Sequence, residues 1–385
     1  PYSKNGEQKT KPTQHSVKEL RSIGLQPDIV VGRCGDELAP ETKEKIALFC
    51  DVPEDAVFSN PDVEDIYRVP LMVESEGLDE YVMERLGIER EALPTDERTS
   101  QWRDLVTREQ SGTVTMALVG KYALEDAYLS IHEALKHAGL ERGVEVDVRW
   151  VDAEEMASTH QERLRAADAI VVPGGFGSRG TDEKIAAVRY AREHGVPFLG
   201  LCLGFQMAVV EAARNVCGLE GADSTEMHPD TSHPVIDLLP EQYDLEDLGG
   251  TMRLGAHETT IDPGTLAAAL YGDTCTERHR HRYEVNPEYI EALEAGGLRF
   301  SGRANNRMEI LERPEHPFFF GTQFHPEFRS RPGRASPPFV GLLDAALAER
   351  DADGRDADSR DADGRDADGG SRRERPDERE SEVEA

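Results

Sequence analysis

A regular alternation of apolar and amphipathic stretches, which begins at residue 113, constrains the fold of this chain more than any other feature. Residues 113–120, TVTMALVG, predict a buried strand, and residues 126–139, DAYLSIHEALKHAG, predict an amphipathic helix that ends at a glycine. Further strands are predicted at 144–151, 168–175 and 196–201, and further helices at 161–168, 181–195 (with Thr181 as its N-cap) and 204–216. Because strands that alternate with helices pack as a parallel sheet covered on both faces, we expect an α/β fold.

The sequence on either side of this alternation has a different character. Residues 1–98 contain a strand pattern, PDIVVGR, and a helix pattern, ETKEKIALFC, and we expect them to form a separate region joined by a linker at 99–112. The main domain is predicted at 113–346, where the later elements are shorter and more strand-like. Residues 347–385 carry a repeat of RDADG without an apolar residue larger than alanine, so they cannot bury a core and are predicted to be disordered. The repeat lacks the distal glutamate of a complete calcium loop, and we expect no calcium site there.

The charge balance excludes some partners and indicates a compartment. The formal net charge is −32, and the 44 basic residues are 9 lysines and 35 arginines. Such an acidic surface repels nucleic-acid backbones, and its shortage of lysine is what we expect of a halophile, whose salt-loaded cytoplasm screens self-repulsion. No apolar run approaches the roughly 18 to 20 residues of a membrane span, and no secretory signal is recognisable, which predicts a cytoplasmic protein. Because Pro1 stands in place of an initial methionine, we expect further sequence before it.

The cysteines form no metal-binding or disulfide pattern, but one of them lies at an unusual position. No C-x-x-C pair occurs among them, so reduced thiols are expected. Cys202 lies in GLCLGFQM (200–207), between the strand predicted at 196–201 and the helix predicted at 204–216. Gly204 permits an immediate turn into the helix, so we expect the thiol at the carboxyl end of a parallel strand, where ligands bind in such sheets. The first N–H groups of the helix then face the sulfur and favour its thiolate form.

A cysteine nucleophile needs a base and hydrogen-bond donors for the oxyanion, and two further segments supply them. PGGFG (173–177) offers backbone N–H groups, and FHPEF (324–328) contains His325 and Glu327. Positions two apart on a strand face the same way, so the carboxylate can orient the imidazole. The predicted catalytic triad is Cys202, His325 and Glu327. The alternative is a core cysteine and an unrelated H-P-E segment on the surface.

Lysines are concentrated at the start of a chain that otherwise avoids them. Six of the 9 lysines fall within the first 45 residues: Lys4, Lys9, Lys11, Lys18, Lys43 and Lys45. The cluster predicts an anionic ligand, and a chance grouping on one helix face is the alternative.

Several long segments resemble the CTP synthase family, whose members are glutamine amidotransferases with a Cys-His-Glu triad. They are KTKPTQHSVKEL (9–20), GGTMRLG (249–255), ERHRHRYEVN (277–286) and QFHPEF (323–328), and the resemblance runs to about residue 346. It implies that the parallel-sheet amidotransferase domain follows the C-terminal part of a P-loop-like α/β synthase (amidoligase) domain. It also implies a ligase that aminates UTP to CTP in pyrimidine biosynthesis, with ATP, Mg²⁺ and glutamine as nitrogen donor. In that family GTP activates glutamine hydrolysis, the product CTP inhibits the enzyme, and the enzyme is a homotetramer.

The resemblance implies roles for particular residues of this sequence. Glutamine is expected at Gly175, Phe176, Leu203, Gly204, Phe205, Gln206, Glu226 and Arg282, with Gly175 and Leu203 supplying the oxyanion donors. UTP and CTP are expected at Lys9, Thr10, Lys11, Pro12, Thr13, Gln14 and Lys45, ATP at Arg33 and Val63, and GTP at Phe176, Arg179 and Gly180. No metal ligand is expected in this chain. Taken alone, the RHRHR segment is equally consistent with a solvated basic run.

The sequence departs from the family in one respect. The family's phosphate-binding loop and Mg²⁺ carboxylates lie in an N-terminal stretch that these residues do not include, and no G-x-x-x-x-G-K-[ST] occurs here. We therefore expect this chain by itself to hydrolyse glutamine without forming CTP. Two alternatives stay open: another amidotransferase or free-standing glutaminase, and a regulatory or filament-forming scaffold that keeps the triad without using it.

Overall fold

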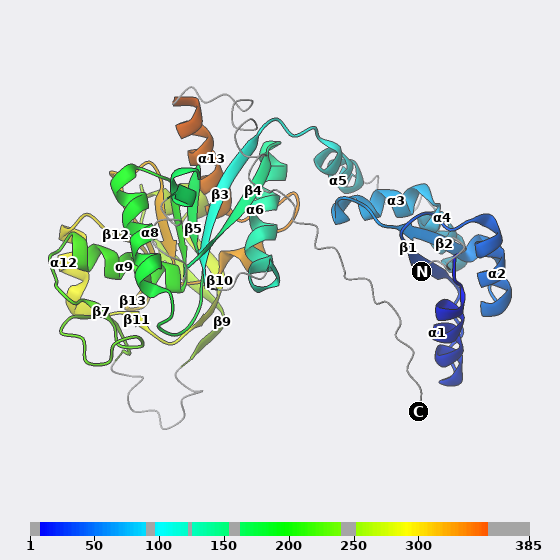
Figure 1. Ribbon diagram of the computed structural model, residues 1–385, viewed down its shortest axis with the longest axis horizontal. Coiled ribbons are helices and arrows are strands. Elements are labelled where there is room, and N and C mark those ends of the chain that lie inside the picture. Colours follow the sequence, from blue (N-terminus) through cyan, green and yellow to red (C-terminus); the bar gives the residue numbers. More distant parts are fainter. Residues whose placement is uncertain (1–7, 90–96, 122–124, 154–161, 240–251, 353–385) are drawn as a thin grey trace, which may run out of the picture. The chain divides into compact units, whose positions relative to one another are not determined.

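The computed structural model describes residues 8–89, 97–121, 125–153, 162–239 and 252–352 of the chain. The chain divides into two compact units, Pro1–Arg108 and Glu109–Ala385 (Figure 1). No helix in these described ranges is long and apolar enough to cross a membrane. The tail is predicted to be disordered from residue 347, but residues 347–352 continue the helix Pro337–Ala352, so the predicted boundary is wrong there. The rest of the predicted tail lies outside the described residues.

The first unit is built on two short parallel strands, β1 (Val30–Cys34) and β2 (Val57–Pro61). Its helices are α1 (Lys11–Ser22), α2 (Pro40–Cys50), α3 (Val69–Ser75), α4 (Leu78–Leu86) and α5 (Glu97–Thr107), with 3-10 turns η1 (Glu54–Ala56) and η2 (Ile66–Arg68). The core contains Val17 of α1, Ile46 of α2 and Val30 and Val57 of the two strands. The segment predicted as a linker contains most of α5, which is a helix.

A nine-stranded sheet forms the frame of the second unit, in the order β10-β9-β12-β13-β14-β6-β5-β3-β4. The parallel part consists of β3 (Thr113–Gly120), β4 (Glu145–Asp152), β5 (Ala169–Val172), β6 (Phe198–Leu201) and β14 (Phe319–Thr322). The antiparallel part consists of β9 (Arg253–Ile261), β10 (Thr274–His281), β12 (Arg299–Ala304) and β13 (Arg307–Glu312). A separate small sheet contains β7 (Asp223–Ser224), β8 (Pro234–Asp237) and β11 (Glu284–Val285). The parallel half is therefore the part that the alternating sequence pattern predicted.

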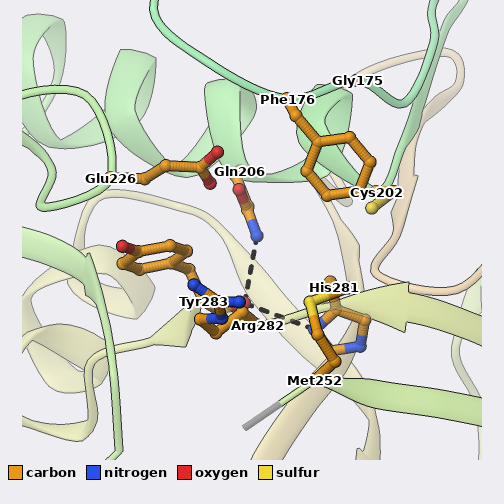
Figure 2. Close-up of a pocket in the computed structure, with 9 residues that line it drawn as sticks. All are labelled: Gly175, Phe176, Cys202, Gln206, Glu226, Met252, His281, Arg282 and Tyr283. Carbon is orange, nitrogen blue, oxygen red and sulfur yellow. Dashed lines mark hydrogen bonds between the residues drawn. The ribbon is translucent and has the colours of Figure 1, made fainter. Parts of the chain in front are cut away.

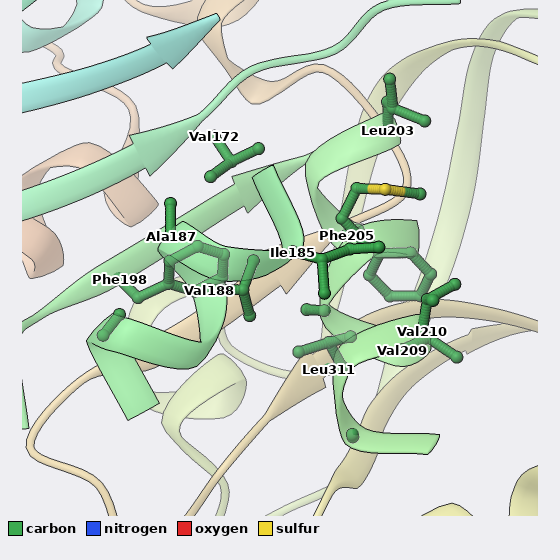
Figure 3. Close-up of a cluster of buried hydrophobic side chains, with 14 of the residues drawn as sticks. Val172, Ile185, Ala187, Val188, Phe198, Leu203, Phe205, Val209, Val210 and Leu311 are labelled. Atoms are coloured by element: carbon green, nitrogen blue, oxygen red, sulfur yellow. The ribbon is translucent and has the colours of Figure 1, made fainter. Parts of the chain in front are cut away.

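Helices cover both faces of the parallel strands, as expected for an α/β fold. One face packs against α8 (Thr181–His194) and α9 (Leu203–Asn215), and Figure 3 shows Val172 and Phe198 of the sheet among Ile185, Val188 and Phe205 of these helices. The other face packs against α6 (Leu129–Arg142) and α13 (Pro337–Ala352). The remaining elements are α11 (Leu266–Tyr271), α12 (Ile290–Ala295), η4 (Glu125–Tyr128), η6 (Pro287–Tyr289) and η7 (Pro326–Arg329). Because both faces are covered, the carboxyl ends of the strands are where side chains reach solvent.

The start of α8 differs from the prediction in one detail. Gly180, with φ +70°, is the N-cap, and Thr181 is the first helical residue. The Thr181 hydroxyl donates to the Ser178 carbonyl oxygen over 2.9 Å and does not cap the helix. Glycine is required here because a Cβ on Gly180 would lie 2.8 Å from the Cβ of Ala153. The prediction of Thr181 as N-cap is therefore wrong by one residue.

Candidate active site

Cys202 lies at a sharp corner between β6, which ends at Leu201, and α9, which begins at Leu203. Its backbone takes φ +51°, a region that residues other than glycine rarely adopt, and its N–H donates to the Thr322 carbonyl oxygen over 2.7 Å. The side chain is 3% exposed. The corner therefore presents the sulfur at the carboxyl end of the strand, beside the first N–H groups of the helix.

Two glycines make this corner sterically feasible. A Cβ on Gly200 would lie 2.8 Å from the carbonyl carbon of Gly204, and a Cβ on Gly204 would lie 2.0 Å from the carbonyl oxygen of Val172. Side chains at these positions would push α9 away from β5 and β6. The glycines that flank Cys202 in the sequence are thus explained by the close packing of the helix against the sheet.

His325 and Cys202 lie on the same side of Gly174. A Cβ on Gly174 would be 2.8 Å from Cε1 of His325 and 3.4 Å from Cβ of Cys202. His325 Nδ1 and Glu327 Oε1 are 2.7 Å apart, with both side chains largely buried. Burial works to lower the pKa of His325, but the facing Cys202 and Glu327 outweigh it and raise that pKa well above its ordinary value. This environment favours an imidazolium beside the sulfur, the charge state of a Cys-His nucleophile pair.

The contact between His325 and Glu327 does not come from a strand. Strand β14 ends at Thr322, and Glu327 belongs to the 3-10 turn η7. The expectation of an extended segment through Glu327 is wrong because Pro326 lacks an N–H for strand pairing and fixes its φ at a value suited to a turn. The turn folds the carboxylate back toward the ring, so the two side chains meet by a different geometry.

A pocket of about 110 Å³ opens beside Cys202 (Figure 2). It is lined by Gly175, Phe176, Cys202, Gln206, Glu226, Met252, His281, Arg282 and Tyr283. Glu226 is its carboxylate and Arg282 its guanidinium, so the pocket carries partners for the ammonium and the carboxylate of a free amino acid. The amide of Gln206 donates to the Tyr283 carbonyl oxygen over 3.1 Å, which fixes its orientation.

The residues expected to hold glutamine divide into two groups. Gly175, Phe176, Gln206, Glu226 and Arg282 line the pocket, whereas Leu203, Gly204 and Phe205 form the first turn of α9. The Phe205 ring lies in the core (Figure 3). Leu203 begins the helix, so its N–H has no partner within the helix and is directed toward the corner at Cys202.

The loop at 174–177 covers one side of the pocket and is held at three points. The N–H of Gly177 donates to Glu226 Oε1 over 3.1 Å, and Lys121 Nζ donates to the Phe176 carbonyl oxygen over 3.4 Å. The guanidinium of Arg280 lies 5.4 Å from the centre of the Phe176 ring, a cation–π distance. Phe176 is 47% exposed, so its ring lies at the mouth of the pocket.

Behind the pocket, β10 buries a line of polar side chains. Glu277, His279 and His281 point inward, and Arg278 and Arg280 point to solvent. Burial lowers the pKa of His279 to about 2 and that of His281 to about 3, and it raises the pKa of Glu277 to about 7. The RHRHR segment is therefore half solvated and half buried, with neutral imidazoles on its inner face.

Among the described residues, His279, His281 and Glu309 are grouped closely enough to hold a metal ion. Some of their donor atoms are already engaged: His279 Nδ1 and His281 Nε2 form a hydrogen bond of 2.9 Å, and Arg253 contacts Oε1 of Glu309, whereas Oε2 of Glu309 is buried without a hydrogen-bond partner. Two imidazoles and an arginine-paired carboxylate do not fit Mg²⁺, which takes oxygen ligands in proteins. The expectation that this chain supplies no metal ligand stays a prediction.

In the first unit, the residues expected to bind UTP or CTP gather at the start of α1. Lys9 and Thr10 precede the helix, and its first turn contains Lys11, Pro12, Thr13 and Gln14. The side chain of Thr10 is buried and accepts a hydrogen bond of 3.0 Å from the Gln14 amide. With no acidic residue in the first turn, the helix dipole and two lysines make this end electropositive. Lys45 lies on the exposed side of α2.

The residues expected near ATP and GTP lie at other strand and helix ends. Arg33 is on β1, where it pairs with Asp62 over 3.3 Å, and Val63 follows β2. Both therefore lie at the carboxyl end of the parallel pair, where ligands bind in α/β sheets. Arg179 and Gly180 immediately precede α8, close in sequence to the 174–177 loop.

Four residues near the site were not predicted from the sequence: Met252, His281, Tyr283 and Gln323. The Gln323 amide lies 3.8 Å from the Cys202 sulfur and accepts from the Gln206 amide over 3.2 Å. Strand periodicity was a usable signal for His281, because alternation along β10 turns it inward. Met252 carried no signal, since its position depends on how distant segments meet.

Comparison with known proteins identifies relatives of both units. The family glutamine amidotransferase class-I matches residues 123–345, and the family CTP synthase N-terminus matches residues 1–88. The CTP synthase of Natronomonas pharaonis is 74% identical over 354 residues, 92% of this chain and 65% of the relative. The CTP synthase of Halobacterium salinarum is 75% identical over 352 residues, 91% of this chain and 64% of the relative.

A solved structure extends the comparison to three dimensions. The Trypanosoma brucei CTPS glutaminase domain with bound acivicin has a TM-score of 0.57 and 37% sequence identity, covering 61% of this chain and 94% of that one. The α/β fold and the resemblance to CTP synthases are thereby confirmed, although the chain spans only about 65% of the length of its first relative. The amidotransferase match covers more than half of this chain. The chain therefore belongs to the class-I glutamine amidotransferase family, and within that family it is similar to CTP synthases.

Proposed function

We propose that this chain hydrolyses glutamine to glutamate and ammonia at Cys202. The observation that carries the proposal is the position of the Cys202 sulfur, which faces an imidazole bonded to a buried carboxylate and opens into a pocket with one acidic and one basic group. Arg282 binds the α-carboxylate of glutamine through its guanidinium fork, and Glu226 binds the α-ammonium. The side-chain amide then extends toward the sulfur.

In the first half of the reaction, the thiolate of Cys202 attacks the amide carbon and the carbonyl π-electrons move onto oxygen. The N–H groups of Gly175 and Leu203 donate to this oxyanion. His325, held as imidazolium by Glu327, gives its proton to the amide nitrogen, the C–N bond breaks, and ammonia leaves. The product on the enzyme is a thioester.

In the second half, the neutral imidazole of His325 takes a proton from water, and the resulting hydroxide attacks the thioester carbon. The C–S bond breaks, the thiolate is regenerated beside the imidazolium, and glutamate is released. The role of Glu327 in both halves is to orient the ring and stabilise the imidazolium.

We further propose that the complete protein is a cytoplasmic CTP synthase that passes this ammonia to UTP in an ATP-dependent reaction. The support is the name shared by its relatives and the electropositive start of α1, which suits nucleotide phosphates. Lys9–Gln14 and Lys45 then bind UTP or the inhibitor CTP, Arg33 and Val63 adjoin ATP, and Phe176, Arg179 and Gly180 adjoin the activator GTP. Assembly as a homotetramer, and the absence of nucleic-acid and membrane partners, belong to the same proposal. The one close group of metal-ligating side chains among the described residues does not fit Mg²⁺. In this proposal the chain contributes ammonia and nucleotide binding to the amination.

The experiment is glutamate release by the purified chain, compared with Cys202→Ala. Cys217→Ala is the matched control, since this half-buried cysteine lies at the end of α9, away from the pocket. We expect Cys202→Ala to abolish release and Cys217→Ala to leave it unchanged. Hydrolysis that persists in Cys202→Ala, or is lacking in the native chain, contradicts the proposal. Binding of UTP by the native chain, measured separately, distinguishes a CTP synthase fragment from a free-standing glutaminase.

A further inference from the structure

Lys184 occupies a position on α8 that packing alone would give to an apolar residue. The buried face of this helix consists of Thr181, Lys184, Ile185, Ala187, Val188 and Ala191, spaced three and four residues apart. Lys184 is 1% exposed and is among the largest fully buried side chains of the described residues. Lysine is rarely buried to this extent unless it is paired, so its presence requires a reason.

The ammonium of Lys184 has no anionic partner in the part of the chain that the structure describes. The charged group that acts on it is another cation, Lys121, and together with burial this lowers the pKa of Lys184 to about 8. Lys184 also belongs to the first turns of α8, where the helix dipole opposes a positive charge. Three physical effects therefore disfavour a charge at this point. Asp182 and Glu183 lie in the first turn of the same helix, but no described carboxylate forms an ion pair with the ammonium.

The position of the ammonium relates it to the loop that covers the glutamine pocket. Lys184 Nζ lies 3.6 Å from where a Cβ on Gly175 would be, and the side chain of Leu203 lies 3.4 Å from the same point. Gly175 and Leu203 are the two residues whose N–H groups are expected to donate to the oxyanion. Lys121 bonds to the next residue of the loop, Phe176, so two of the three lysines of the second unit adjoin this loop.

We propose that Lys184 is a positioning residue for the oxyanion hole, whose ammonium supports the 174–177 loop from behind and raises the positive potential at Gly175 and Leu203. The inference rests on the proposed glutaminase reaction. No described carboxylate forms an ion pair with this ammonium in the free site, and the tetrahedral intermediate supplies a negative charge beside the loop. An interaction that appears only when the oxyanion forms lowers the barrier without tightening substrate binding, so it affects kcat and leaves KM unchanged.

The test compares Lys184→Met and Lys184→Arg with the native chain. Methionine resembles lysine in length and shape but is apolar, and arginine retains the charge. Lys136→Met is the matched control, because it removes a lysine charge from α6, which packs on the other face of the sheet from α8. The measurements are kcat and KM for glutamate release, the pH profile of kcat/KM, and the thermal midpoint of unfolding.

Lys184→Met is expected to lower kcat about tenfold with KM unchanged, and to raise the thermal midpoint by about 3 °C because a buried charge is removed. The kcat/KM of the native chain is expected to fall above about pH 8 as the Lys184 ammonium loses its proton. This decrease near pH 8 is expected to be missing from the pH profile of Lys184→Met. Lys184→Arg recovers kcat in part.

A native kcat in Lys184→Met overturns the proposal. A joint loss of kcat and thermal midpoint also overturns it, since that result identifies a purely structural lysine. If the native chain itself does not hydrolyse glutamine, the proposed function is wrong. If the native chain is active and only the Lys184 variants give unexpected results, the proposed role of Lys184 is wrong, so the two failures are distinguishable.

Discussion

Replacing Glu327 with glutamine tests whether the carboxylate supports catalysis by its charge. Glutamine has nearly the same shape and retains an oxygen that can accept from His325 Nδ1, so the 2.7 Å contact is sterically preserved. The negative charge is lost, and with it one of the two effects that raise the pKa of His325. The substitution therefore separates orientation of the ring from stabilisation of its positive charge.

The size of the effect follows from the burial of the pair. The Glu327 side chain is 4% exposed and that of His325 is 14% exposed, so solvent screens their interaction only weakly. A hydrogen bond to a charged group contributes about 1.5–3 kcal/mol, and each 1.4 kcal/mol changes a rate tenfold. We expect Glu327→Gln to lower kcat by about 10- to 150-fold, since the imidazolium is needed to protonate the leaving nitrogen.

The pH dependence gives a second, independent readout. The pKa of His325 is raised in the folded protein, so the imidazolium is present below that pKa and is lost as the pH rises through it. Without the charge of Glu327 the pKa falls, and the alkaline limb of the kcat profile is expected to move to lower pH. Glutamate release across a pH series, with exposed Glu288→Gln as control, measures both effects. An unchanged kcat and an unmoved alkaline limb would refute the role assigned to Glu327.

Three further substitutions test other parts of the site. Arg282→Lys is expected to raise KM for glutamine about 30-fold with little change in kcat, because lysine cannot form the paired contact with a carboxylate; steady-state kinetics measure it. Gly204→Ala is expected to reduce the free energy of unfolding by about 3 kcal/mol in a denaturant titration, because the new methyl group would lie 2.0 Å from a carbonyl oxygen of β5. Replacing Lys9 and Lys11 together by alanine is expected to weaken UTP binding about 100-fold in calorimetry, since two cations are lost at the start of α1. Lys18→Ala, further along the same helix, is its control, and equal losses in both variants would contradict the assigned site.

The local parts of the site were predictable because they depend on short-range sterics. Glycines on both sides of Cys202 imply a tight strand-to-helix turn, and the structure shows the backbone clashes that any side chain at Gly200 or Gly204 would cause. The contact between His325 and Glu327 was predictable from their spacing, although the turn at Pro326 and not a strand produces it. In both cases the residues that decide the geometry are adjacent in the sequence.

The remainder of the site depends on how distant strands pair, which a local pattern does not contain. Alternation along β10 is a local signal that His281 points inward, but its place beside the pocket depends on the register in which β10 pairs with β9. Lys184 occurs in a helix pattern that also suits a solvated lysine, and only the packing of α8 on the sheet shows that it is buried. A polar residue on the inner face of a helix, such as Lys184, is therefore one that sequence periodicity assigns to the surface.

Three of the most deeply buried carboxylates of this acidic protein are paired with arginine, unlike the buried ammonium of Lys184. Glu211, Glu284 and Glu309 are each at most 1% exposed in their side chains, and each is paired with an arginine. Pairing of this kind reduces the cost of burial only in part, since burial still raises the pKa of Glu284 to about 8 and that of Glu309 above its ordinary value. It is little affected by salt, which screens mainly exposed charges. Lys184 is as deeply buried as these glutamates, but the charged group that acts on it among the described residues is another cation, Lys121. Because no described carboxylate pairs with this ammonium, its charge is available to stabilise a negatively charged reaction intermediate. Glutamine hydrolysis would produce that intermediate at the loop that Lys184 adjoins.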